Sequence, residues 1–161
     1  MELDHFRPYT RAGFEHLEHD PCNLHHACGR CNRLKSNKWP CPHPANSHDS
    51  VVGFVDPFAE VRSVYFEVTD SGDLVPLQHP AAYLIRVLAL NRPLLKLRRR
   101  RRIYERELNR YEAENLPRWE AAHAGQGGMT LEELARDFSQ YRRLRQLSTI
   151  PLKKPEIGGQ V

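Results

Sequence analysis

Two short stretches near the N-terminus, residues 3–8 and 22–36, constrain the fold of this chain more than any other feature. The first stretch places the pair Asp4-His5 at the end of a short apolar segment and closes on a proline. The second places Asn23 after a polar loop and runs into a Cys-x-x-Cys-Asn-x-x-Lys pattern. These patterns predict consecutive local elements: the tail of a strand within residues 1–8, a polar loop over 9–21, a short strand over 24–27 and a helix over 29–36.

These residues resemble the HNH endonucleases, nucleases of the ββα-metal or His-Me finger class, whose fold carries a His…Asn…Asn series. The resemblance covers residues 3–40, with the polar positions of the motif in the right order. It includes a Trp39-Pro40 ending that is typical of one bacterial branch. The resemblance implies a small bacterial HNH protein, a metal-dependent endonuclease that hydrolyses phosphodiester bonds in DNA as an effector of anti-phage defence or restriction. RNA as substrate, and nicking or double-strand cleavage, stay open.

The chemistry of phosphodiester hydrolysis gives the polar residues of the motif their expected roles. The reaction needs an activated water, positive charge at the phosphoryl oxygens and in-line positioning. His5 is the candidate base, because an imidazole accepts a proton near neutral pH. Asp4 and Asn32 are the candidate ligands of a catalytic Mg²⁺ or Mn²⁺ ion, which takes oxygen donors. By analogy with the family, Asn23 is expected to brace the imidazole. Taken singly, each residue is an ordinary turn, loop or cap residue, so the interpretation depends on their combination.

The cysteines indicate a second, structural metal site whose ligands stay open. Many zinc-bearing HNH proteins have one Cys-x-x-Cys ahead of the Asp-His pair and another before the last Asn. Here only the second is present, as Cys28 and Cys31. Either the natural protein begins further upstream, or Zn²⁺ is completed by Cys41 with His43 or Cys22. The alternative is that both thiols are reduced and pack as small hydrophobic groups beneath the helix.

The rest of the chain predicts an α+β protein with a ββα-metal HNH finger, a small β-hairpin and a mainly helical C-terminal region. The hairpin strands are expected over 63–69 and 74–77, and helices over 81–88 and 94–115, with a separate piece beginning at Pro117. Thr130 and Glu133 predict a capping box for a last helix. The expected parts are a nuclease core over 1–45, a linker and β-unit over 46–78, a helical extension over 79–147 and a flexible tail over 148–161.

Positive charge is concentrated in an arginine block, residues 98–102, within the predicted long helix. Crowded like charges on a helix are unfavourable unless an anion relieves them. Contacts with phosphate groups, which carry no sequence information, are therefore expected. The alternative is a solvated charged face. The predicted nucleic-acid contacts are Arg98, Arg99, Arg101 and Arg102, with Arg30, Arg33 and Lys35 at the end of the motif.

Composition limits the partners and the compartment. The chain has a net charge of +4 and a sequence pI near 9.0, which suits a polyanion and favours double-stranded DNA. Its mean hydropathy is -0.66, and no apolar run approaches the length of a membrane span. With the motif starting directly after Met1, no leader peptide is expected, and a cytoplasmic protein is predicted.

Two rival functions belong to other classes. One is a catalytically silent, zinc-finger-like module that binds nucleic acid. The other is a nuclease that stays inactive until a protein partner, such as an ATPase subunit, activates it. A binding module needs zinc but no magnesium, so cleavage tests with different metals separate the first rival from an enzyme.

Overall fold

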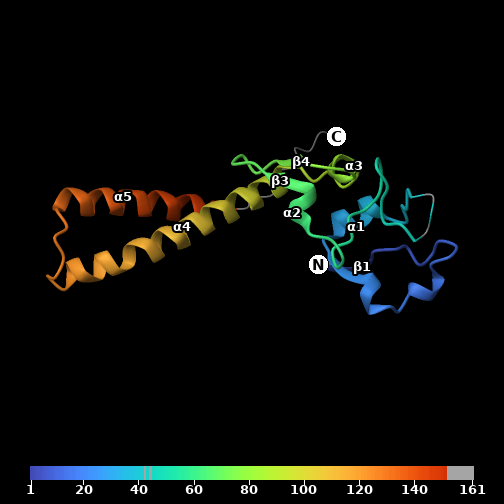
Figure 1. The fold of residues 1–161 in the computed structure, drawn as a ribbon, viewed down its shortest axis with the longest axis horizontal. Helices are drawn as coiled ribbons and strands as arrows, with labels where there is room; N and C mark the ends of the chain where they lie inside the picture. The colour runs from blue at the N-terminus through green and yellow to red at the C-terminus, as the bar shows by residue number, and fades with distance from the viewer. Residues whose placement is uncertain (42, 44, 152–161) are drawn as a thin grey trace, which may run out of the picture. The chain divides into compact units, whose positions relative to one another are not determined.

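The computed structural model describes residues 1–41, 43 and 45–151, and these adopt the predicted α+β fold (Figure 1). The chain forms two units, one of residues 1–69 and 74–92 and the other of residues 70–73 together with the chain from 93 onward. Unit 1 contains, in chain order, β1 (Glu2–His5), η1 (Glu15–Leu17), η2 (Pro21–Asn23), β2 (Leu24–Ala27), α1 (Gly29–Lys35), α2 (Arg62–Tyr65), β3 (Phe66–Val68), β4 (Leu74–Pro76) and α3 (Ala81–Val87). Unit 2 contains α4 (Pro93–His123) and α5 (Leu131–Ser148).

The elements predicted from the motif form where the sequence places them. Strands β1 and β2 pair antiparallel, and their register sets Asp4 opposite His25. Helix α1 follows directly, with Cys28 as its N-cap, because the Cys28 sulfur accepts the backbone N–H of Cys31 at 3.3 Å. The helix ends at Lys35, and its C-cap Ser36 has a φ of 50°, which is not helical. These local signals are short-range, which is why the sequence alone placed them.

An aromatic core holds unit 1 together. Trp39 lies at its centre, with ring centroids 5.4 Å from Phe6, 5.4 Å from Phe14 and 6.3 Å from Phe54. The buried core residues are Phe6, Phe14, Trp39, Cys41, Phe54, Tyr65, Phe66, Leu74, Ala81 and Leu84. The core therefore spans both predicted boundaries, after residue 45 and after residue 78. The β-unit and α3 belong to the same unit as the motif, because their apolar residues are buried in the same core.

The strand expected over 63–69 is shorter than predicted. The chain first makes the single helical turn α2 and only then the three-residue strand β3, which pairs with β4. Tyr65 and Phe66 are adjacent and both buried, whereas a strand sends neighbouring side chains to opposite faces. The helix-to-strand change at these residues allows both rings to enter the core. Val64 and Val68, on either side of Phe66, are 50% and 40% exposed.

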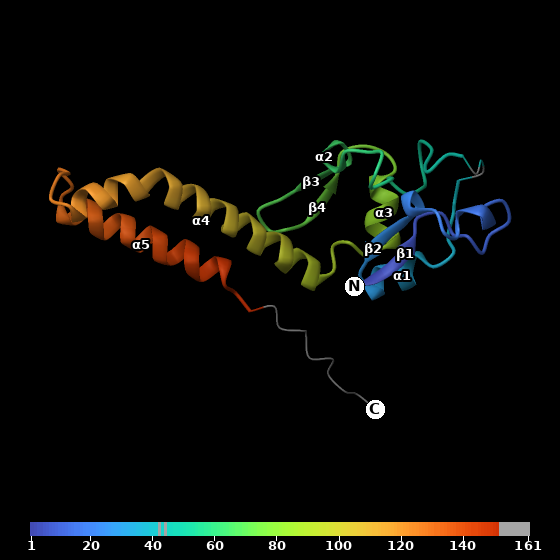
Figure 2. The same cartoon turned by 90° about the horizontal axis from the view of Figure 1, so that it is seen from below.

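Helix α4 continues past the point where the sequence predicted its end. Pro117 lies inside it, although proline removes one backbone hydrogen bond from a helix. The next turn carries Trp119, whose ring lies 6.0 Å from Tyr111 and 5.8 Å from Tyr141 of α5. The indole Nε1 also donates to the Asp137 carboxylate at 3.3 Å. Packing against α5, which lies beside α4 in Figure 2, thus outweighs the local signal.

The last helix begins as predicted, with a capping box at Thr130. The Thr130 hydroxyl accepts the backbone N–H of Glu133 at 3.2 Å, and the Glu133 carboxylate accepts the Thr130 N–H at 2.9 Å. Several apolar positions of α5 are exposed rather than packed, with Leu131 at 85% and Phe138 at 57%. From residue 152 onward, the predicted tail lies outside the described residues. Within the described ranges, no helix is both long enough and apolar enough to cross a lipid bilayer.

Candidate active site

A cavity of about 250 Å³ gathers three of the four predicted motif residues. Asp4 and His5 are the last residues of β1, and Asn32 reaches the cavity from α1. Lys35 lies one helical turn after Asn32 on the same face and lines the same space. The antiparallel pairing of β1 with β2, followed at once by α1, therefore brings together residues about thirty positions apart in the sequence.

The imidazole of His5 is held by a backbone group. Its Nε2 lies 2.9 Å from the carbonyl oxygen of Glu18. A carbonyl oxygen only accepts hydrogen bonds, so Nε2 carries the proton in this contact. In the neutral imidazole the lone pair is then on Nδ1. The ring of Tyr9 packs beside it, at a centroid distance of 4.5 Å. His5 thus has the tautomer that a base acting through Nδ1 requires.

The expected role of Asn23 is corrected. Its side chain is 2% exposed and bonds to backbone groups: Oδ1 accepts the Arg7 N–H at 2.7 Å, and Nδ2 donates to the carbonyls of Arg7 at 3.0 Å and Leu17 at 3.2 Å. It does not bond to the imidazole of His5. Asn23 instead ties the chain just after β1 to the loop over residues 9–21, at Leu17. Its effect on the imidazole is therefore indirect, through the position of a carbonyl group.

Asp4 is buried and lies between two basic side chains. Its Oδ1 is 3.3 Å from Nζ of Lys35, and its Oδ2 is 3.8 Å from Nε2 of His25. The Lys35 ammonium also donates to the backbone carbonyl of His5. Burial lowers the pKa of Lys35, and the Asp4 charge opposes that shift. Burial likewise lowers the pKa of His25.

Lys35 was predicted to contact phosphate groups, and this assignment is corrected. The residue is 5% exposed, and its ammonium is bonded to Asp4 and to the His5 carbonyl. Lys35 therefore acts on a residue of the site rather than presenting a free cation to solvent. Arg30 and Arg33 differ from it, since both are exposed on α1 and their side chains make no hydrogen bond or ion pair with any residue described.

The amide of Asn32 has a defined orientation. Nδ2 donates to the carboxylate of Glu2 at 3.1 Å, and a carboxylate that is ionised only accepts. The second polar atom of the amide is the carbonyl oxygen Oδ1, and it makes no hydrogen bond to the described part of the chain. The cavity thus offers a carboxylate from Asp4 and an amide oxygen from Asn32. These are the donor types that Mg²⁺ and Mn²⁺ take, with water completing the coordination.

The predicted zinc ligands do not gather into one site. The sulfurs of Cys28 and Cys31 are each 3.3 Å from Nη2 of Arg92. Cys41 is 3% exposed within the aromatic core, and His43 is exposed, with its Nδ1 accepting a backbone N–H of a nearby residue. Across residues 1–41, 43 and 45–151 no three His, Cys, Asp or Glu residues form a group that could hold a metal ion. Two thiols alone do not complete a tetrahedral zinc site.

The remaining candidate ligand, Cys22, is exposed and lies in η2. Its backbone N–H donates to the Asp20 carboxylate, which caps that short helix. The cysteines of the described chain are free thiols. Cys22 is thus part of a capped turn beside Asn23 and does not close a site around the Cys28–Cys31 pair.

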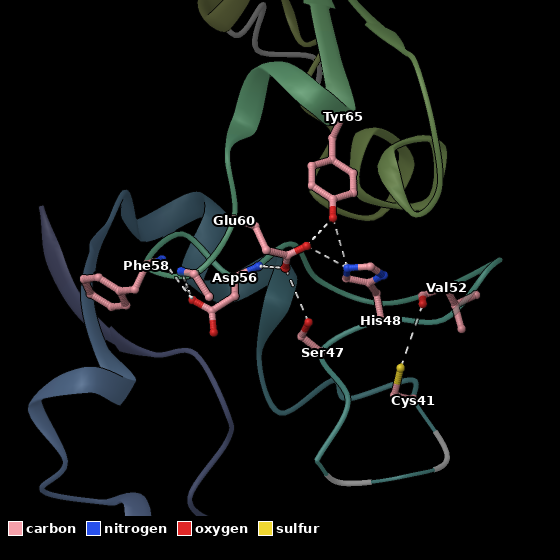
Figure 3. A network of polar contacts seen from close by, with 9 residues as sticks. Cys41, Ser47, His48, Val52, Asp56, Phe58, Glu60 and Tyr65 are labelled. Atoms are coloured by element: carbon pink, nitrogen blue, oxygen red, sulfur yellow. Dashed lines mark hydrogen bonds and ion pairs between the residues drawn. The ribbon is translucent and has the colours of Figure 1, made fainter.

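A second polar cluster, centred on Glu60, lies in the segment expected to be a linker (Figure 3). The Glu60 carboxylate accepts from the Tyr65 hydroxyl, lies 2.8 Å from His48 Nε2 and accepts the Asp56 N–H at 2.7 Å. The Ser47 hydroxyl adds a contact of 3.5 Å. Burial opposes ionisation, but the hydrogen bonds from Tyr65, Asp56 and His48 lower the pKa of Glu60 overall. Sequence analysis gave Glu60 no role, because its partners come from separate turns.

The side chains of the arginine block, residues 98–102 of unit 2, make two kinds of contact. Arg98, Arg101 and Arg102 line a cavity of about 330 Å³, which also contains Glu105. Arg101 is paired there with Glu105 at 2.8 Å. Arg99 is not among the residues that line this cavity, and its Nε donates to the carbonyl of Gly72 at 2.6 Å. Arg99 thus makes a contact within the protein, and its phosphate contact stays a prediction.

Comparisons of the chain with models of protein families, with curated proteins and with solved structures give no match. The chemistry of the cavity is therefore interpreted from its own lining residues. Those residues are a histidine with a fixed tautomer, a buried carboxylate and an amide oxygen without a hydrogen-bond partner in the described chain. Sequence reasoning missed His25, whose position opposite Asp4 follows from the strand register, and the pairing of Lys35 with Asp4.

Proposed function

We propose that this chain is a metal-dependent endonuclease of the HNH type, which hydrolyses phosphodiester bonds in DNA. The observation that carries the proposal is the contact between His5 Nε2 and the Glu18 carbonyl, in a cavity also lined by Asp4 and Asn32. The order β1, β2, α1, with His5 at the end of the first strand, supports a ββα-metal finger. An effector of anti-phage defence or restriction is the corresponding biological role.

In the proposed reaction, Nδ1 of His5 accepts a proton from the attacking water as its oxygen bonds to phosphorus and the bond to the leaving 3′ oxygen breaks. The Glu18 carbonyl keeps the Nε2 proton in place and stabilises the imidazolium that forms. When bound, Mg²⁺ or Mn²⁺ supplies positive charge to the phosphoryl and leaving oxygens. Asp4 and Asn32 would hold it through one carboxylate and one amide oxygen.

Binding of double-stranded DNA is proposed through arginines whose side chains have no ion-pair or hydrogen-bond partner among the described residues. On α1 these are Arg30 and Arg33, which are exposed one turn apart. In unit 2 the exposed pair Arg98 and Arg102 lines the arginine cavity. Their contacts would neutralise backbone phosphates without reading bases, so binding would be sensitive to salt.

A structural Zn²⁺ is retained only as a proposal for the Cys28–Cys31 pair, which would need further ligands. Metal analysis of the purified protein measures it directly. One equivalent of zinc per chain, lost together with folding on chelation, would support the structural role. A folded protein without zinc would assign both thiols to packing around Arg92.

The proposed nuclease activity is tested by conversion of supercoiled plasmid to nicked or linear DNA with Mg²⁺, Mn²⁺ or a chelator. His5→Ala and Asn32→Ala are expected to abolish cleavage while the proteins stay folded and still bind DNA. His26→Ala is the matched control, because His26 is exposed on the neighbouring strand and does not line the cavity. It should cleave like the wild type.

Other outcomes separate the rival functions. A folded wild type that binds DNA but cleaves none would favour a nucleic-acid-binding module. Cleavage that appears only with an added partner, such as an ATPase subunit, would favour a partner-activated effector. Cleavage that persists in His5→Ala would contradict the assignment of the base.

A further inference from the structure

The carboxylate of Asp4, the proposed metal ligand, already has a positive partner within the protein. Its Oδ1 is 3.3 Å from the Lys35 ammonium, and the two side chains are 8% and 6% exposed. The same ammonium donates to the backbone carbonyl of His5. Lys35 is therefore held at two points, both at the end of β1.

A buried carboxylate without a partner charge is costly, so Lys35 stabilises Asp4 when no metal ion is bound. The same contact opposes metal binding. A divalent cation on Asp4 would lie close to a buried ammonium, where charges interact more strongly than in water. His25 also approaches Asp4, but its Nε2 is 3.8 Å from Oδ2, which is farther than the 3.3 Å between Oδ1 and the Lys35 ammonium. The charge that competes is therefore that of Lys35.

We propose that Lys35 is a positioning residue that competes with the metal ion: it holds Asp4 in place in the metal-free protein and weakens the binding of divalent cations. The proposal rests on the proposed function only in taking Asp4 as a metal ligand. Asp4 and Lys35 together are neutral, so the empty site attracts a cation weakly. The negative charge of a phosphodiester then adds to the attraction, and metal binding becomes coupled to substrate binding.

The test measures Mn²⁺ affinity by electron paramagnetic resonance of the full chain, at one fixed pH near neutrality. Lys35→Met keeps an unbranched side chain, one heavy atom shorter, but removes its charge, and it is expected to bind Mn²⁺ about tenfold tighter or more. Lys35→Gln, which keeps a hydrogen-bond donor, should change affinity in the same direction. Lys38→Met is the matched control, because Lys38 is exposed and its ammonium donates, among the described residues, to the helix carbonyl of Leu34 alone. Asp4→Asn should lose Mn²⁺ binding.

Thermal unfolding provides a readout independent of activity. In chelator, Lys35→Met should unfold at a lower temperature than the wild type, because Asp4 loses its partner charge. Added Mn²⁺ should raise the unfolding temperature of the variant more than that of the wild type, since tighter binding to the folded state stabilises it more. An uncleaved DNA duplex should raise the Mn²⁺ affinity of the wild type more than that of Lys35→Met.

Defined results would overturn the proposal. Unchanged or weaker Mn²⁺ binding in both Lys35 variants would exclude competition, as would failure of both variants to fold even with Mn²⁺. A loss of duplex binding in chelator by Lys35→Met would assign Lys35 to phosphate contacts instead. Wild-type protein that binds Mn²⁺ through Asp4 and cleaves DNA, with no gain in the Lys35 variants, would leave the proposed function intact. Tighter Mn²⁺ binding in Lys35→Met without any cleavage by the wild type would support the role of Lys35 and contradict the proposed nuclease function.

Discussion

Asn23 provides the sharpest test of how the candidate site is built. Its amide makes three hydrogen bonds, to the N–H of Arg7 and to the carbonyls of Arg7 and Leu17, and its side chain is almost fully buried. Replacement by alanine removes all three bonds, whose backbone partners on Arg7 and Leu17 are partly buried. We therefore expect Asn23→Ala to act first on stability, and on cleavage through the displaced loop.

The magnitude follows from the number of bonds. A protein hydrogen bond contributes about 0.5–1.5 kcal/mol net, so three bonds amount to about 3 kcal/mol. Ordinary domains have a free energy of unfolding of about 5–15 kcal/mol, so the variant should stay folded in water. With a urea m-value of about 2 kcal/mol per molar, the unfolding midpoint should fall by about 1.5 M.

Urea unfolding followed by tryptophan fluorescence is a suitable assay, because Trp39 lies in the core of unit 1. Asn32→Ala is the matched control. It loses one bond to Glu2 near the surface, which is worth about 1 kcal/mol or less, but also removes a proposed metal ligand. Asn32→Ala should therefore lose cleavage with little change in midpoint. A wild-type midpoint for Asn23→Ala, with cleavage alone abolished, would refute the structural role and restore the direct contact with the imidazole that the family resemblance implied.

Two further predictions concern the other clusters. Glu60→Gln should cost about 2 kcal/mol at neutral pH, because hydrogen bonds to a charged acceptor are lost. Because folding lowers the pKa of Glu60, its contribution is fully present above the ordinary value of 4.5 and is lost as the pH falls through the folded-state pKa, so urea midpoints of variant and wild type should converge in acid. Arg98→Ala with Arg102→Ala should weaken DNA binding and reduce the slope of log K against log salt by about 2. Arg99→Ala, which loses the bond to the Gly72 carbonyl, should lower stability and leave that slope unchanged.

The parts of the fold that sequence analysis predicted are those with local causes. The capping box at Thr130 and the short strand over 24–27 depend on residues a few positions apart. The predicted end of α4 was wrong, because a proline signal at Pro117 was outweighed by the packing of Trp119 against α5. No local pattern contains that contact, since its partner lies on another helix.

The same distinction applies to the site. Helical spacing puts Asn32 and Lys35 on one face, and strand pairing puts Asp4 opposite His25, so both neighbours of the carboxylate were available from the sequence. The missing information was burial. Once Asp4 lies in a nearly closed environment, the lysine pairs with it instead of pointing to solvent. Cys41 lies apart from the Cys28–Cys31 pair for a related reason, because it is buried in the aromatic core.

The loop over residues 9–21 shows why the motif ends on a tryptophan. Phe14 is buried against Trp39, with ring centroids 5.4 Å apart, and this contact anchors the middle of the loop in the core. Next in the chain come the carbonyl of Leu17, which Asn23 binds, and the carbonyl of Glu18, which binds His5. The tautomer of the proposed base therefore depends on an aromatic contact made by a residue over thirty positions away. Trp39 and His5 belong to one structural unit, because the core fixes the loop and the loop fixes the imidazole.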